Sequence, residues 1–297
     1  MNNNQITHGI FYALAAYLMW GIAPLYFKQL AEVPAMEILM HRIIWSGLIL
    51  LMFVSLLKQW PKVRYALKNK QVMLVLLMSS LLIGANWTLF IWAVNNDHLL
   101  DASLGYYINP VLNVFLGRVF LGERLKKLQK LAVLLALTGV LVQVISFGEL
   151  PLIALALASS FGIYGLLRKQ VAVDSLPGLL IETVMLLPFA LIYWALFASP
   201  ASNMLTNELN YNALLIAAGA VTVAPLLCFT AAARRLRLSA LGFMQYIGPT
   251  LMFFLAVNVY DEALEISKLI SFSFIWFALG IFTYDALRKS SSACDTA

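Results

Sequence analysis

The stretch that decides the fold is Leu104-Gly105-Tyr106-Tyr107-Ile108-Asn109-Pro110, inside an apolar run that ends near Glu123. Part of it returns later, where residues 241–249 read Leu-Gly-Phe-Met-Gln-Tyr-Ile-Gly-Pro and their run ends near Glu262. One constant offset, with no gap, matches Tyr107, Pro110 and Glu123 to Tyr246, Pro249 and Glu262. The match indicates two related halves, and a duplicated apolar chain is typical of a transporter.

The composition excludes an ordinary soluble protein. Of 297 residues, 62% are hydrophobic and only 11% are charged, which is more apolar surface than a water-soluble core can hide. The net charge of +6 comes from bases in short loops, where they act as topology signals, so we expect no nucleic-acid partner. The two cysteines, Cys228 and Cys294, give neither a disulfide framework nor a metal-binding spacing.

Apolar runs long enough to cross a bilayer as helices follow one another along the whole chain. We predict an all-α integral membrane protein with ten transmembrane helices, at residues 9–28, 35–57, 72–94, 101–120, 128–147, 150–168, 177–197, 212–233, 239–259 and 266–287. Strands of a β-barrel would be shorter and would alternate polar and apolar residues.

The loop charges predict the orientation. Lysines and arginines concentrate in alternate loops, for example at 58–70, 124–130 and 234–237, while the opposite loops carry mostly Asp and Glu. Basic loops stay cytoplasmic, so both termini should be cytoplasmic. Five helices in each half is an odd number, so residues 1–147 and 148–297 should form a 5+5 inverted repeat within a single membrane domain.

Three motifs resemble those of the RarD-type permeases, in the EamA branch of the drug/metabolite transporter superfamily. They are residues 101–110, the Gly122-Glu123-Arg124-Leu125 ending, and residues 37–42. The resemblance covers essentially all ten spans. It implies an inverted-repeat permease of the bacterial inner membrane, in which spans 1–4 and 6–9 enclose a central cavity. The family's substrates are small metabolites, amino-acid-like compounds and drugs, and the RarD-type branch implies no settled one.

Two charges lie well inside predicted spans, several residues from either end. Arg42 is the costliest residue in the chain, and we interpret it as a counter-charge for a substrate carboxylate, with a structural pair or a snorkelling side chain as the alternative. Glu182 either takes up a proton or binds an ammonium group, or it is an interfacial glutamate exposed to water. His41, one turn from Glu37, is a second proton-coupling candidate, although the two side chains could simply pair.

Polar and aromatic side chains complete the predicted substrate site. Pro110 and Pro249 should break their helices and free the carbonyls of Tyr106 and Gln245, or else only shape packing. The remaining candidates lie deep in the spans, where core packing is the alternative for each aromatic ring. They are Trp20, Asn86, Trp87, Tyr107, Asn109, Asn113, Tyr164, Gln245 and Tyr246.

The absent motifs restrict the function. The chain has no phosphate-binding Walker motif, no metal-ligand cluster and no Gly-x-Ser-x-Gly elbow, so we expect neither cofactor, metal nor catalysis. We predict a secondary transporter of small organic solutes that works by alternating access in the lipid bilayer. Protons are a potential coupling partner. The alternative is a membrane-embedded enzyme or sensor. Substrate, direction of transport and oligomeric state stay open.

Overall fold

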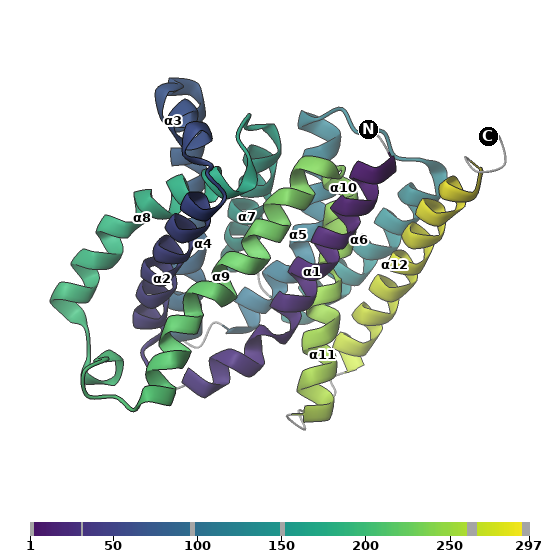
Figure 1. Ribbon diagram of the computed structural model, residues 1–297. Coiled ribbons are helices and arrows are strands. Elements are labelled where there is room, and N and C mark those ends of the chain that lie inside the picture. Colours follow the sequence, from purple (N-terminus) through teal and green to yellow (C-terminus); the bar gives the residue numbers. More distant parts are fainter. Residues whose placement is uncertain (1–2, 31, 96–98, 149–151, 260–265, 293–297) are drawn as a thin grey trace.

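The computed structural model describes residues 3–30, 32–95, 99–148, 152–259 and 266–292 (Figure 1). Its described residues form helices and connecting turns without strands. The helices are α1 (Asn3–Phe27), α2 (Ala35–Leu56), α3 (Trp60–Lys68), α4 (Lys70–Asn95), α5 (Leu99–Phe120), α6 (Lys127–Phe147), α7 (Leu152–Gln170), α8 (Ser175–Phe197), α9 (Leu209–Arg235), α10 (Leu238–Gln245), α11 (Ile247–Val259) and α12 (Ile266–Ser292). Two short 3-10 turns are η1 (Lys28–Leu30) and η2 (Pro200–Ser202).

The helix ends agree with the predicted apolar runs to within a few residues. Within the described residues, eight segments are long and apolar enough to cross a membrane, the last being Leu238–Val259. Helix α12 adds a shorter apolar stretch, Leu269–Asp285. The all-helical prediction is therefore confirmed.

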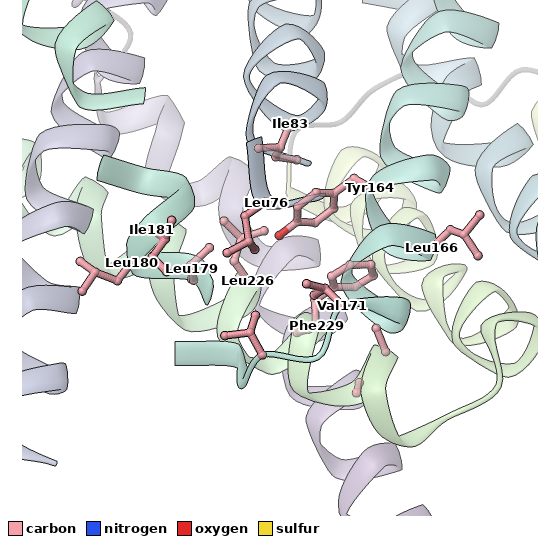
Figure 2. Packing of buried hydrophobic residues seen from close by; sticks show 14 of the residues in the cluster. Leu76, Ile83, Tyr164, Leu166, Val171, Leu179, Leu180, Ile181, Leu226 and Phe229 are labelled. Atoms are coloured by element: carbon pink, nitrogen blue, oxygen red, sulfur yellow. The ribbon is translucent and has the colours of Figure 1, made fainter. Parts of the chain in front are cut away.

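The core joins elements that are distant in sequence. Helix α1 packs on α9, α2 on α8 and α9, α5 on α7, and α6 on α12. In Figure 2, Leu76 of α4, Tyr164 of α7 and Phe229 of α9 meet in the main apolar cluster. Outward-facing side chains such as Phe189 (65% exposed) are also apolar, which suits contact with lipid rather than water.

Helix α3 was not predicted, because its residues read as a polar loop. The preceding turn places Lys58 in the left-handed region (φ 52°), a conformation that favours glycine. The turn lets α3 fold back so that Val63 and Ala66 are buried, in packing against α4 and α8. Figure 1 shows α3 on the face of the bundle where α1 begins and α12 ends.

The two matched prolines differ in their surroundings. Helix α5 continues through Pro110, which removes one backbone hydrogen bond from it. The segment that contains the matched Pro249 is divided at Tyr246 into α10 and α11. Tyr246 directly follows Gln245, whose carbonyl loses its helical hydrogen bond because Pro249 has no N–H. The two segments cross closely, since a Cβ on Gly242 would lie 2.8 Å from the Pro110 carbonyl oxygen.

Glu123 lies close to the start of α10 in the other half. Its carboxylate accepts hydrogen bonds from the backbone amides of Leu238 (2.6 Å) and Ser239 (3.0 Å) and from the Ser239 hydroxyl (2.6 Å). These amides are among the first N–H groups of α10, which have no partner inside the helix. Glu262, its counterpart in the sequence match, lies outside the described residues.

Candidate functional site

Arg42 is half-buried on α2 and is contacted from three other helices. Its Nε donates a 2.8 Å hydrogen bond to Thr222 Oγ1 of α9. The guanidinium carbon lies 5.0 Å from the ring centroid of Trp87 on α4 and 5.5 Å from that of Phe27 on α1, both within cation–π range. None of the carboxylates in the described parts of the chain forms a salt bridge with Arg42.

We call Phe27, Arg42, Trp87 and Thr222 the Arg42 site. The Thr222 hydroxyl donates in turn to the carbonyl of Ala218 (2.8 Å), so its lone pair is aimed at the guanidinium. The guanidinium is therefore held by neutral partners, and no carboxylate in the described residues balances its positive charge. A planar fork in that condition suits a carboxylate or phosphate ligand.

A small cavity adjoins this site on the side of α8. It holds about 10 Å³, room for roughly one water molecule, and Trp87 and Thr222 line it together with Ser46, Thr183 and apolar side chains. Pockets for organic ligands are on the order of 300 Å³ or more. An organic solute can therefore enter only if the helices around the cavity separate.

Glu182 on α8 is buried (2% exposed), so the water-exposed alternative is wrong for it. Its Oε1 lies 3.6 Å from Nη1 of Arg168, which is completely buried on α7. The Ser79 hydroxyl of α4 donates to the same Oε1. Arg168 also donates from Nη2 to the carbonyl of Ser175 (3.3 Å). One carboxylate thus ties three helices together.

Several buried polar atoms in and beside the Arg168–Glu182 pair have no hydrogen-bond partner among the described residues. Within the parts of the chain that the structure describes, these are Oε2 of Glu182, Nε and Nη1 of Arg168, and the nearby hydroxyl of Tyr164. Buried donors and acceptors are nearly always satisfied by protein or by ordered water. The cluster can therefore exchange partners or hold water without losing an existing bond.

His41 and Glu37 do not pair with each other. Glu37 accepts hydrogen bonds from the amide and the hydroxyl of Ser199 (2.9 Å each), which joins the start of α2 to the end of α8. His41 accepts at Nδ1 from the indole of Trp45 (3.2 Å), and its buried Nε2 has no partner among the described residues.

The predicted amide residues bond to other helices. Asn109 donates to the carbonyl of Ala158 (2.7 Å), and Asn113 donates to Asn109 (2.9 Å) and to Gln245 (3.2 Å). Asn86 donates to the carbonyl of Leu157 (2.9 Å) and to Ser160 (2.8 Å). These bonds connect α4, α5, α7 and α10, and they use both amide donors of Asn86 and Asn113 and one donor of Asn109.

Of the predicted aromatic residues, Trp87 contacts Arg42 and the others pack against rings elsewhere. Trp20 lies 5.8 Å from Phe229, and Tyr164 stacks on the same ring at 6.0 Å. Tyr107 lies 5.3 Å from Phe272. Tyr246 lies 6.4 Å from Phe243 and also donates to the carbonyl of Tyr107 (3.2 Å), a direct link between the two matched tyrosines.

Sequence reasoning missed four members of these clusters: Phe27, Ser79, Thr222 and Arg168. Phe27 and Thr222 carry no charge and lie in apolar runs, so no sequence signal distinguishes them. Arg168 was read as a loop base beside Lys169, although its place at the end of an apolar run could have marked it. Burial decided the difference, because the side chain of Arg168 turns inward against Gly178.

Comparisons with known proteins point to one family. Residues 7–145 match the model of the EamA-like transporter family. The chain is 56% identical to protein RarD of Escherichia coli (strain K12), over 97% of each chain. It is 54% identical to an uncharacterized transporter of Vibrio cholerae, over 96% of this chain and 95% of the other. A crystal structure with 18% identity shares the fold, with a TM-score of 0.72 over 93% of this chain and 96% of that one.

Proposed function

The chain belongs to the EamA-like transporter family, and from this premise we propose that it is a secondary transporter of small organic solutes in the bacterial inner membrane. The solutes are metabolites, amino-acid-like compounds or drugs that carry an anionic group. Residues 1–147 and 148–297 act as two inverted halves of ten transmembrane helices, and solute passes between them by alternating access. Both termini lie in the cytoplasm, in keeping with the loop charges and with the common face of α1, α3 and α12.

The observation that supports the anionic group is the state of Arg42. An arginine at the centre of a transmembrane helix costs about 2.5 to 3.5 kcal/mol on insertion scales, unless water, a partner or a ligand offsets it. Arg42 has a hydroxyl and two rings as neighbours and no carboxylate partner among the described residues. A bound carboxylate would accept two parallel hydrogen bonds from the guanidinium.

The rings on either side favour a solute with an apolar body next to its anionic group. Trp87 both contacts Arg42 and lines the small cavity, so it borders the path from the charge into the bundle. Alternating access would widen this cavity first toward one side and then toward the other. The alternative function, a membrane-embedded enzyme or sensor, has no such support in the geometry.

Proton coupling is the second part of the proposal. A proton on Glu182 would remove the charge that attracts Arg168 and would weaken the link between α4, α7 and α8. The free Oε2 offers a place for that proton. His41 is the secondary candidate, since its Nε2 is also without a partner in the described residues.

Ligand binding followed by uptake tests the proposal. The purified protein is screened against small carboxylates and their uncharged amides by thermal stabilisation, because a ligand of the folded state raises the melting temperature. A hit is then measured for uptake into liposomes that contain only this protein. We expect Arg42→Leu to abolish uptake and Arg42→Lys to lower it strongly, because a point charge loses the bidentate fork.

Arg124→Leu, which removes an exposed arginine from the loop before α6, is the matched control and should transport normally. Normal uptake by Arg42→Leu would remove Arg42 from the substrate site. Chemical conversion of the compound without accumulation would favour the enzyme alternative.

A further inference from the structure

Helix α3 presents an exposed basic and aromatic face at one end of the bundle. Trp60, Arg64 and Lys68 follow one another at four-residue intervals, so their side chains stand one turn apart along one stripe. Val63 and Ala66 point the other way and are buried. Trp60 is 39% exposed, and its indole is held by a 3.2 Å hydrogen bond to Ser55.

The cations on and around this stripe have no acidic partner. Lys58, Arg64, Lys68 and Lys70 are all exposed, and among the described residues none forms a salt bridge. The sequence contains no Asp or Glu between Glu37 and Asp97. Asp174, the acid next to α3, already binds Lys62 and Arg234.

The position of α3 places this face at the membrane surface. Helix α2 is long and apolar enough to span the bilayer, and it ends at Leu56, two residues before the Lys58 turn. Leu56 and Leu57 are exposed to the surroundings on the approach to α3. Tyr65 on α3 is 65% exposed, and tryptophan and tyrosine prefer the headgroup level of a bilayer.

We propose that the outer face of α3 is a binding site for anionic phospholipid headgroups. Arg64 and Lys68, one turn apart, hold a lipid phosphate between them, and Lys58 and Lys70 add charge at either end. Trp60 and Tyr65 insert among the glycerol and acyl groups, as rings of interfacial helices do. Each basic side chain near an anionic surface contributes about 1 kcal/mol, which is about fivefold in binding per cation.

The site is separate from transport chemistry. It uses no member of the Arg42 site and no residue of the Arg168–Glu182 pair, so its test stands whether or not the chain carries an organic anion. The Lys62–Asp174 contact (2.7 Å) joins α3 to the start of α8, in addition to the packing of Val63 and Ala66.

Lipid binding is measured on the full-length protein in detergent by native mass spectrometry with phosphatidylglycerol, and with phosphatidylcholine for comparison. The variant Arg64→Gln/Lys68→Gln/Lys70→Gln should bind phosphatidylglycerol on the order of a hundredfold more weakly, with phosphatidylcholine binding unchanged. The control Arg124→Gln/Lys127→Gln/Lys130→Gln removes the same number of positive charges from the first turn of α6 and the loop before it. This control should bind phosphatidylglycerol as strongly as the unmodified protein does.

A second variant guards against misfolding of the first. Arg64→Lys/Lys68→Arg/Lys70→Arg keeps every charge and should retain phosphatidylglycerol within a few-fold. The proposal is overturned if the α3 glutamine variant binds phosphatidylglycerol as the unmodified protein does. It is also overturned if the α6 control loses as much binding, because general positive charge would then explain the affinity, or if phosphatidylcholine binds as strongly.

Discussion

Arg42 and Glu182 hold corresponding places in the two halves, yet their surroundings are opposite. Each lies seven residues beyond the first residue of its helix, Ala35 for α2 and Ser175 for α8. Glu182 is buried with a full counter-charge, Arg168, and a hydroxyl donor. Arg42 is half-buried against a hydroxyl and two rings. Within the described residues, the charge of Glu182 is therefore neutralised by Arg168, whereas Arg42 has no acidic partner.

The difference determines what each charge can do at rest. A buried pair loses stability when one partner is removed, because the other charge stays buried and alone. An arginine without an acidic partner leaves no charge behind when it is removed. Removing Glu182 should therefore destabilise the ligand-free protein strongly, whereas removing Arg42 should destabilise it little.

The largest effect is expected for Glu182. Glu182→Leu should lower the free energy of unfolding by about 3–5 kcal/mol, because Arg168 keeps its charge in a buried position. Adding Arg168→Met should restore most of the loss, since well-packed apolar residues can replace a buried pair. The measurement is denaturant or thermal unfolding of both variants in one detergent. If Glu182→Leu alone were as stable as the unmodified protein, the ion pair between Glu182 and Arg168 would not be formed.

Ser79 should give a smaller effect on the same cluster. Ser79→Ala removes the hydroxyl that donates to Glu182 Oε1 and leaves the carboxylate with Arg168 alone. A lost hydrogen bond to a buried charged group costs about 1.5–3 kcal/mol. Ser80→Ala is the neighbouring control and should cost less, because the Ser80 hydroxyl contacts the Leu77 carbonyl and the Met185 sulfur rather than a charged group. Equal losses of stability in the two variants would mean that the Ser79 hydroxyl does not bond to the Glu182 carboxylate.

Removing Arg42 should change stability little without ligand. Arg42→Leu loses the bond to Thr222 and two cation–π contacts, but it also relieves the cost of holding a guanidinium at that depth. We expect a net change within about 1 kcal/mol of unfolding free energy. A loss as large as that of Glu182→Leu would show that Arg42 has a carboxylate partner after all, and the contrast between the two regions would fail.

Asp174 should give the smallest effect, although its ion pairs are shorter than the 3.6 Å pair of Arg168 and Glu182. It lies 2.7 Å from Lys62 and 2.5 Å from Arg234, but its side chain is 40% exposed, and exposed pairs contribute about 0.2–1 kcal/mol. The hydrogen bond from Lys62, which has the larger effect, and the hydrogen bond from Arg234 lower the pKa of Asp174.

A carboxyl whose pKa is lowered on folding stabilises the protein above its unfolded pKa, and that stabilisation is lost as the pH falls through the folded value. Unfolding curves of Asp174→Asn and the unmodified protein should therefore differ slightly at neutral pH and converge in acid. A gap that persists at acid pH would assign the effect to packing rather than to charge.

Sequence reasoning located the charges better than their partners. The depth of Arg42 and Glu182 follows from counting residues in an apolar run, and both lie inside helices as predicted. The inward turn of Arg168 and the approach of Thr222 depend on tertiary packing between α4, α7, α8 and α9, which no local pattern encodes. The asparagines were correctly placed deep in the helices, but the pattern could not tell that Ala158, Leu157 and Gln245 would accept their hydrogen bonds.

The matched prolines show the same limit. Tyr107, Pro110, Tyr246 and Pro249 repeat faithfully, and the tyrosines do meet across the two halves. The two segments share a tyrosine and a proline but differ in backbone, since α5 is continuous while the segment with Pro249 is divided at Tyr246. The two segments also have different neighbours, since α5 packs on α7 while α10 packs on α5 and α11 on α1.

The contact of Glu123 with the start of α10 has a consequence for biosynthesis. The cap of a helix in the second half comes from a residue more than a hundred positions earlier, already made when α10 leaves the ribosome. The amides of Leu238 and Ser239 can therefore be satisfied as soon as they reach Glu123, whereas a second half made alone would expose them. An N-terminal half that carries Glu123→Ala should accordingly associate with the C-terminal half more weakly than the unmodified half does, by about 0.5–2 kcal/mol, the usual cost of a lost helix cap.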